Sequence, residues 1–315
     1  MLHLRLITPA DKTDDVVRLI EKTIGATHLA VMPGAARDPE GDVVMCDVAR
    51  EAGDTLIGGL RALGIDKSGS IALENIDLSL SRRADEAEDD APGEGADAVL
   101  WEQLSDVTHE ESTLSITYVA FITLATMIAA CGVVLDNAIL IVGAMAVGPE
   151  FGPLAGFCTA IVQRAPRLAL RSLIAVLAGF AIAMAVTVGF SFFMDAVGLF
   201  TEKQLDQERP NTGFVYAPDW FSFVVAVLAG AAGTLSLTSA KSGALVGVAI
   251  SVTTVPAAAN AAVALSYGDA RQTQGSTEQL LLNLLGIVLA GTLTLLAQKF
   301  FWARQHERTA KSQLT

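Results

Sequence analysis

Two long apolar segments of this chain are interrupted near their midpoints, and the first interruption carries a carboxylate. Residues 138–161 are apolar enough to cross a bilayer, yet their centre reads Gly148, Pro149, Glu150, Phe151, Gly152 and Pro153. The second interruption, Ser251 to Asn260, contains Pro256 and lies inside residues 243–265. Backbone that leaves a helix at membrane depth is tolerated only where protein or a water-filled cavity surrounds it. Two such interruptions at corresponding places in two halves are typical of a transporter binding site.

The composition indicates a membrane protein. Hydrophobic residues make up 52% of the 315 residues, and the mean hydropathy of +0.48 is too high for an ordinary soluble domain. The net charge of −13 argues against a nucleic acid polymer as a partner. The three cysteines, Cys46, Cys131 and Cys158, do not have the spacing of a metal site, and we expect no metal and no cofactor. Residues 1–10 lack the pattern of a signal peptide, so we expect the N-terminal part to be cytoplasmic.

Residues 1–80 predict a small α+β domain of the ferredoxin-like type. Apolar residues alternate at Leu2, Leu4 and Leu6, which is the period of a strand. Further strands are predicted at 27–32, 44–48 and 71–80, with helical spacing at 16–24 and 56–63 between them. The last strand has a phase slip at Glu74-Asn75. The order β-α-β-β-α-β is that of the split β-α-β fold.

Residues 81–98 form an acidic stretch without aromatic or β-branched residues, and we expect a disordered linker there. Residues 99–111 predict a short amphipathic helix near the membrane surface, with Trp101 at the interface.

Residues 112–302 predict a transmembrane domain of six helices, followed by a basic tail at 303–315. The six apolar segments are approximately 114–134, 137–163, 168–194, 219–239, 243–266 and 279–301. Each is long enough to cross about 30 Å of hydrocarbon. The Lys and Arg residues cluster in the loops that six crossings place on one side, together with both termini. We therefore expect a multi-pass protein of the inner (cytoplasmic) membrane with both ends in the cytoplasm.

The first three and the last three segments share one plan, in which a plain helix, an interrupted helix and a plain helix follow each other. Because each unit crosses the membrane three times, the second unit must be inverted relative to the first. The sequence thus predicts two inverted 3+3 repeats with interrupted second and fifth helices, as in many secondary transporters.

The interruptions supply chemistry for binding a small solute. Pro149, Pro153 and Pro256 are each a plausible first residue of a new half-helix. The N-terminus of a half-helix has free N–H groups and partial positive charge, which attract an anion or a carboxylate. We expect the two interruptions to face each other and enclose one ligand. The predicted binding residues are Gly148, Pro149, Glu150, Gly152, Pro153, Thr253, Thr254, Pro256 and Asn260.

Glu150 has three interpretations at this depth. Its carboxyl group could be protonated and couple transport to protons, since desolvation favours the neutral form. It could instead coordinate a cation. It could also cap the half-helix that begins at Pro153 and take no part in transport. The glycines around it, spaced by four, also fit close helix packing.

The phrases G-A-M-A-V-G-P-E-F-G-P (Gly143 to Pro153) and I-S-V-T-T-V-P-A-A-A-N (Ile250 to Asn260) resemble domain of unknown function family 389. These are bacterial and archaeal membrane proteins, and the resemblance covers about residues 110–300. It implies a multi-spanning inner-membrane protein, often with a small soluble N-terminal domain, and it supplies no substrate. Many relatives have an apolar residue where Glu150 stands.

The leading functional prediction is a transporter or channel-like carrier of a small polar or anionic solute, with a cytoplasmic regulatory domain. The alternative is a membrane-anchored ligand-binding receptor or scaffold without transport. Small residues on the helix faces favour a homo-oligomer. An enzyme is not expected, and no catalytic residues are predicted, because the four histidines lie outside the spans and no H-E-x-x-H or G-x-S-x-G motif occurs.

Overall fold

A computed structural model describes residues 1–76, 78–91, 98–239 and 253–312, with side chains described as far as residue 301. The chain forms two compact units. The first is built on Met1–Gln103 and the second begins at Leu104. Each unit is described by itself.

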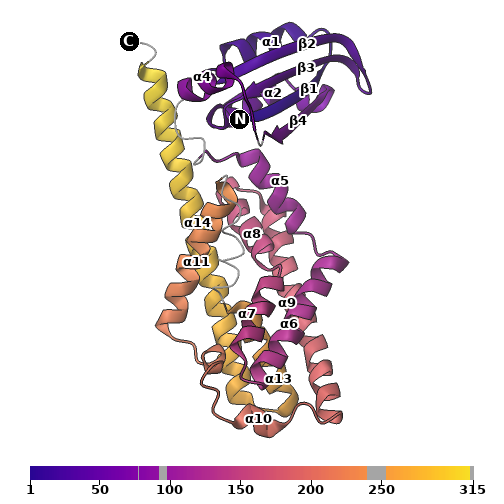
Figure 1. The fold of residues 1–315 in the computed structure, drawn as a ribbon, viewed down its shortest axis with the longest axis vertical. Helices are drawn as coiled ribbons and strands as arrows, with labels where there is room; N and C mark the ends of the chain where they lie inside the picture. The colour runs from indigo at the N-terminus through magenta and orange to yellow at the C-terminus, as the bar shows by residue number, and fades with distance from the viewer. Residues whose placement is uncertain (77, 92–97, 240–252, 313–315) are drawn as a thin grey trace. The chain divides into compact units, whose positions relative to one another are not determined.

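The N-terminal unit is an antiparallel sheet with helices packed on it (Figure 1). Its elements are β1 (Leu2–Thr8), α1 (Thr13–Lys22), β2 (Ala26–Arg37), β3 (Glu40–Val48), α2 (Arg50–Ala62), α3 (Ile65–Ser68), β4 (Ser70–Asn75) and α4 (Arg82–Asp90). The strand order is β2-β3-β1-β4, which is the order expected of the predicted split β-α-β arrangement.

The core of this unit follows the predicted alternation. Leu2, Leu4 and Leu6 on β1 are buried and pack with apolar residues of α1 and α2. Because side chains alternate across a strand, His3 and Arg5 lie on the other face of the sheet.

Two expectations for this region are wrong. The last strand ends at Asn75, where the sequence pattern changes phase, and it does not continue to residue 80. Leu78 and Leu80 are 74% and 91% exposed. Residues 82–90 are helical (α4) where a disordered linker was predicted, because Ala84 and Ala87 form a small buried face. Residues 92–97 of that linker lie outside the described residues.

The second unit is helical. Its elements are α5 (Trp101–Glu111, which begins in the first unit), α6 (Ile116–Val134), α7 (Ala138–Val147), α8 (Phe151–Gln163), α9 (Pro166–Ala196), α10 (Glu202–Asp206), the 3₁₀ helix η2 (Gly213–Tyr216), α11 (Trp220–Thr238), α13 (Thr254–Tyr267) and α14 (Ala270–Ser312). Four helices are long and apolar enough to cross a membrane: α6, α9, α11 and residues 270–301 of α14. The pair α7 and α8, bent by 52°, forms a fifth candidate span. This is the pattern of a multi-pass membrane protein.

The predicted fifth segment, 243–266, is only partly described. Its second half forms α13, and its first half lies outside the described residues. The described residues therefore give four or five candidate spans, and six crossings with inverted repeats stay a prediction.

The last helix begins nearer the N-terminus than expected, at Ala270 rather than residue 279. Gly268 ends α13 in the left-handed conformation, and the Asp269 carboxylate accepts the backbone N–H of Gln272 at 3.0 Å, which caps the new helix. The polar residues that suggested a loop belong to the first turns of α14.

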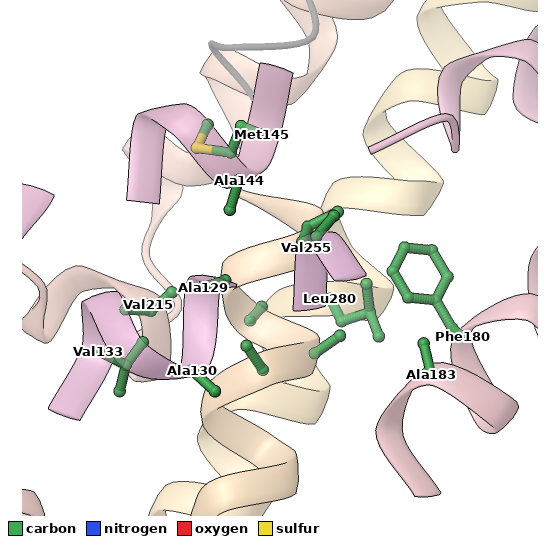
Figure 2. Close-up of a cluster of buried hydrophobic side chains, with 14 of the residues drawn as sticks. Ala129, Ala130, Val133, Ala144, Met145, Phe180, Ala183, Val215, Val255 and Leu280 are labelled. Carbon is green, nitrogen blue, oxygen red and sulfur yellow. The ribbon is translucent and has the colours of Figure 1, made fainter. Parts of the chain in front are cut away.

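Helix α13 is the centre of the helical unit. All residues from Thr254 to Ala264 are buried, and six of these eleven are alanine. Such small side chains allow α6 and α9 to approach the helix closely. Figure 2 shows part of this core, including Ala129 and Ala130 of α6, Phe180 and Ala183 of α9, and Val255 of α13.

Candidate functional site

The first interruption separates α7 from α8. Helix α7 ends at Val147, Gly148 continues in extended conformation, and α8 begins at Phe151. Pro149 lies in the connection, and Pro153 is the third residue of α8, not the first as predicted. The third position tolerates proline because the first N–H groups of a helix have no partner within it.

The second interruption has a matching geometry in its described part. Helix α13 begins at Thr254, after Thr253 at the N-cap position, and Pro256 is again the third helical residue. Ser251 lies outside the described residues.

The structure brings the two interruptions together. The Thr254 hydroxyl donates a hydrogen bond to Glu150 Oε1 at 2.7 Å, and both residues are buried. Gly148 lies against Val255, so a Cβ at position 148 would be 2.9 Å from Val255 Cγ2. The start of α8 and the start of α13 therefore meet inside the helical unit.

Glu150 is 4% exposed, and its second carboxylate oxygen, Oε2, has no hydrogen-bond partner among the described residues. Its side chain makes no capping bond to the first turn of α8. The capping interpretation therefore does not fit, because the carboxylate points to the other half-helix. A buried carboxylate with one free oxygen suits binding of a proton or a cation.

Polar contacts continue from this junction toward α14. Thr253 Oγ1 accepts hydrogen bonds from Asn283 Nδ2 at 2.9 Å and from Gln279 Nε2 at 3.3 Å. About two turns further along α13, Asn260 Nδ2 donates to Ser276 Oγ at 2.7 Å. We call this set, Thr253 and Asn260 of α13 with Gln272, Ser276, Gln279 and Asn283 of α14, the polar seam.

Arg209 closes one end of the polar seam. Its Nη1 donates to Asn260 Oδ1 at 2.8 Å, and its Nη2 donates to Gln272 Oε1. The side chain is 4% exposed and stacks on the Tyr216 ring, 4.8 Å from the ring centroid. The seam thus has a carboxylate near one end and a guanidinium at the other.

Arg209 and the α14 residues were not predicted as site residues. The signal for α14 was present in the sequence, because Gln272, Ser276, Gln279 and Asn283 are spaced by four, three and four, which places them on one helix face. No sequence pattern marked Arg209, because it lies in an irregular loop whose sequence is typical of a solvent-exposed connection. Gly152 and Pro153 were also predicted as site residues. Neither has a polar side-chain atom, so neither takes part in the polar seam through a side chain.

A pocket of about 380 Å³ opens beside the first interruption. Its described lining includes Gly148, Pro149 and Gly152, together with the carboxylates of Glu110 and Glu111 at the end of α5. Partial burial raises the pKa of Glu111, and the charge of Glu110 raises it further. Acidic groups thus lie where the pocket approaches the junction.

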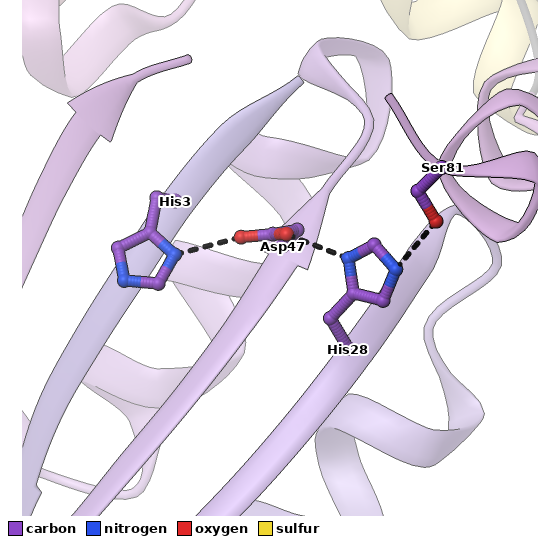
Figure 3. A network of polar contacts seen from close by, with 4 residues as sticks. All are labelled: His3, His28, Asp47 and Ser81. Atoms are coloured by element: carbon purple, nitrogen blue, oxygen red, sulfur yellow. Dashed lines mark hydrogen bonds and ion pairs between the residues drawn. The ribbon is translucent and has the colours of Figure 1, made fainter. Parts of the chain in front are cut away.

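The N-terminal unit carries a polar network on the sheet face opposite its core (Figure 3). The Asp47 carboxylate pairs with His3 Nδ1 and His28 Nδ1, each at 2.7 Å. His28 Nε2 contacts Ser81 Oγ at 2.8 Å. Ser81 directly precedes α4, so the network fastens α4 to three strands. Across the described part of both units, no group of three or more acidic, histidine or cysteine side chains is arranged to hold a metal ion.

Comparison with known proteins covers the residues that form this junction. The family model "Domain of unknown function (DUF389)" matches residues 145–289. The resemblance to DUF389 is confirmed. The DUF389 segment contains both interruptions, Arg209 and the polar residues of α14.

An uncharacterised protein of Methanocaldococcus jannaschii is 24% identical over 203 residues, which are 64% of this chain and 61% of the relative. The match thus spans about three fifths of that relative's length. No solved structure matches. Neither the description of the family nor the name of the relative gives a function or a solute.

Proposed function

We propose that this protein is a carrier that moves a small polar or anionic solute across the membrane, with Glu150 as its proton-accepting group. The observation that supports this most is the contact of the two interruptions at Glu150 and Thr254. Irregular backbone at membrane depth is costly, and two such places in contact are typical of a solute path.

A constant sequence spacing between corresponding elements supports the proposal that the helical unit consists of two repeats. Glu150 and Thr254 are 104 positions apart. The same spacing separates the first residues of α6 and α11, which both have 19 residues, and the first residues of α9 and α14. It also separates Arg164 and Gly268, which end α8 and α13 in the left-handed conformation with the same backbone hydrogen bonds.

This spacing makes Glu150 and Thr254 equivalent positions in the two proposed repeats. When a residue contacts its own equivalent, the contact lies on the symmetry axis that relates the repeats. In an inverted-repeat carrier that axis runs through the solute site near the middle of the membrane. Two such repeats give the proposed six crossings and put both termini on one side of the membrane, and the positions of the Lys and Arg residues favour the cytoplasmic side.

The role proposed for Glu150 follows from its surroundings. Among the described residues, the Glu150 carboxylate is in no ion pair, and the side chain that donates to it is the Thr254 hydroxyl. A buried carboxylate in such surroundings is stabilised by protonation. Loss of that proton when the site opens to water would couple solute movement to a proton gradient. The Thr254 hydroxyl can bond to Glu150 in both protonation states, because it can donate a hydrogen bond to the carboxylate or accept one from the protonated carboxyl group.

The test is proton flux in proteoliposomes that contain a pH-sensitive dye. The purified full chain is exposed to gradients of sodium phosphate, sulfate and glutamate, with sodium chloride as the reference and protein-free liposomes as the blank. We expect at least one of these anions to drive proton movement, and Glu150→Gln to reduce that movement by about tenfold or more while the protein stays folded. The amide keeps the size of the side chain and an oxygen for Thr254.

Asp106→Asn is the matched control, because it removes an exposed carboxylate of α5 that lies outside the lining of the pocket and leaves the junction intact. Its flux should stay within about twofold of wild type, as is usual for an exposed charge. Absence of flux with every anion, or equal flux in Glu150→Gln, contradicts the proposal.

A further inference from the structure

Arg209 is a buried cation whose hydrogen-bond partners are neutral. Asn260 and Gln272 provide carbonyl oxygens of amides, and Tyr216 provides an aromatic face. Among the described residues no carboxylate lies within ion-pair distance of the guanidinium, and Asp136 and Asp269 attract it from farther away. A buried charge without a counter-ion is strongly unfavourable, so a structural role alone accounts poorly for an arginine here.

The guanidinium also has an unused donor. Its Nε–H is buried and has no partner among the residues that the structure describes. Nε and Nη2 form one edge of the guanidinium plane, and Nη2 donates to Gln272 Oε1. A planar or tetrahedral oxyanion binds such an edge with two parallel hydrogen bonds.

The loop that carries Arg209 is held in place from outside the seam. The Asp136 carboxylate accepts hydrogen bonds from Asn211 Nδ2 and Thr212 Oγ1, each at 2.9 Å. Thr212 is fully buried. Arg209 is therefore presented by a fixed backbone, and Gln272 is the group that an incoming anion would displace from Nη2.

We propose that Arg209, with Asn260 and Gln272, is the subsite that binds an anionic group of the solute, a carboxylate or a phosphate. This inference rests on the proposed carrier function and specifies the solute's chemistry. The anion replaces Gln272 on Nη2 and takes the free Nε–H. Asn260 remains on Nη1 and keeps the guanidinium in place.

The test measures the thermal unfolding of the full chain in detergent with sodium phosphate, sulfate or acetate, at an ionic strength matched with sodium chloride. Chloride is the reference because a single atom cannot bind both donors of the edge in parallel. We expect at least one oxyanion at about tenfold its dissociation constant to raise the unfolding temperature of wild type by about 3 °C. Arg209→Gln should abolish that shift.

Gln272→Glu is the second variant, and it preserves the size of the side chain. Its carboxylate would supply the missing counter-ion to Nη2, so the variant should unfold at a higher temperature than wild type and lose the response to oxyanions. This variant keeps the test valid if Arg209→Gln does not fold. Arg271→Gln is the control, because this exposed arginine is adjacent to Gln272 on α14, and it should retain the full shift.

No shift in wild type with any oxyanion overturns the proposal, as does a full shift in Arg209→Gln or Gln272→Glu, or its loss in Arg271→Gln. The carrier function is judged separately by flux. If flux persists at the wild-type level in Arg209→Gln, the proposed carrier function stands and the proposed anion subsite at Arg209 is contradicted. If oxyanions raise the unfolding temperature in a way that depends on Arg209 but the protein shows no flux, the anion subsite stands and the carrier function is contradicted.

Discussion

Gly148 allows the first interruption to lie against the second because it has no side chain. A Cβ there would be 2.3 Å from Glu150 Oε2 and 2.9 Å from Val255 Cγ2. We predict that Gly148→Ala moves the carboxylate and loosens the junction, which lowers the free energy of unfolding by about 1–3 kcal/mol. Proton flux in proteoliposomes should fall by about tenfold or more, because small displacements at such a site have large effects.

Gly143 is the matched control on the same half of the segment. A Cβ at this position of α7 meets nothing within 4 Å. Gly143→Ala should therefore be neutral for flux, and should stabilise the helix by about 0.5–1 kcal/mol because alanine is the better helix former. Equal losses of flux in the two variants would show that the region responds to any added bulk.

At the scale of elements, the polar face of α14 holds the start of α13. Asn283 supplies the shorter of the two hydrogen bonds to Thr253 Oγ1. Asn283→Leu replaces the amide with an apolar group of similar size. We predict that the unfolding temperature changes by only a few degrees, since one buried hydrogen bond contributes about 0.5–1.5 kcal/mol, while flux falls by about tenfold.

Thr294→Val provides the comparison on the same helix, because the Thr294 hydroxyl bonds to its own helix at Ala290 O. It should transport at the wild-type rate. If both variants lower flux alike, α14 contributes through its general packing and the polar seam has no special part.

Helix α4 offers a separate test in the N-terminal unit. Ser81→Ala removes the hydroxyl that His28 Nε2 contacts. We predict about two- to tenfold faster amide hydrogen exchange in α4, as expected for the loss of one hydrogen bond. Exchange in α1, which packs on the other face of the sheet, should not change. Unchanged exchange in α4 would mean that the buried alanines alone hold the helix.

The sequence predicted the elements whose residues repeat with a clear period. Alternation placed β1 and β3, and long apolar runs placed α6, α9 and α11 within a few residues. The start of α14 was missed because its polar residues face inward, and inward-facing polar residues look like a loop when the packing partner is unknown. The two interruptions were predicted to face each other, but the hydrogen bond of Thr254 to Glu150 was not predicted. Arg209 could not be predicted, since only tertiary structure turns its loop toward Asn260.

At the scale of the whole molecule, the proposed six crossings fix which segments share a side of the membrane. In a cysteine-free background, single cysteines at Ser81, Lys203 and Thr315 are treated with an impermeant maleimide in intact cells. We predict labelling at position 203 only, because the other two positions are cytoplasmic in this topology. Labelling at position 315 but not at position 81 would require an odd number of crossings, and labelling at both would invert the proposed orientation.

The central claim is that the two interruptions meet and that the solute passes there. Oxidative cross-linking of Gly148→Cys with Val255→Cys tests it most directly, because their near contact is within reach of a disulfide. Flux is measured in proteoliposomes, in a background free of Cys46, Cys131 and Cys158, before oxidation, after oxidation and after reduction. The account predicts that the cross-link forms. It also predicts that the anion-driven proton flux of the reduced double variant, which is already about tenfold below wild type because position 148 carries a Cβ, stops on oxidation and returns on reduction. The account is contradicted if no disulfide forms between the two cysteines, or if the cross-linked protein transports at the rate measured before oxidation.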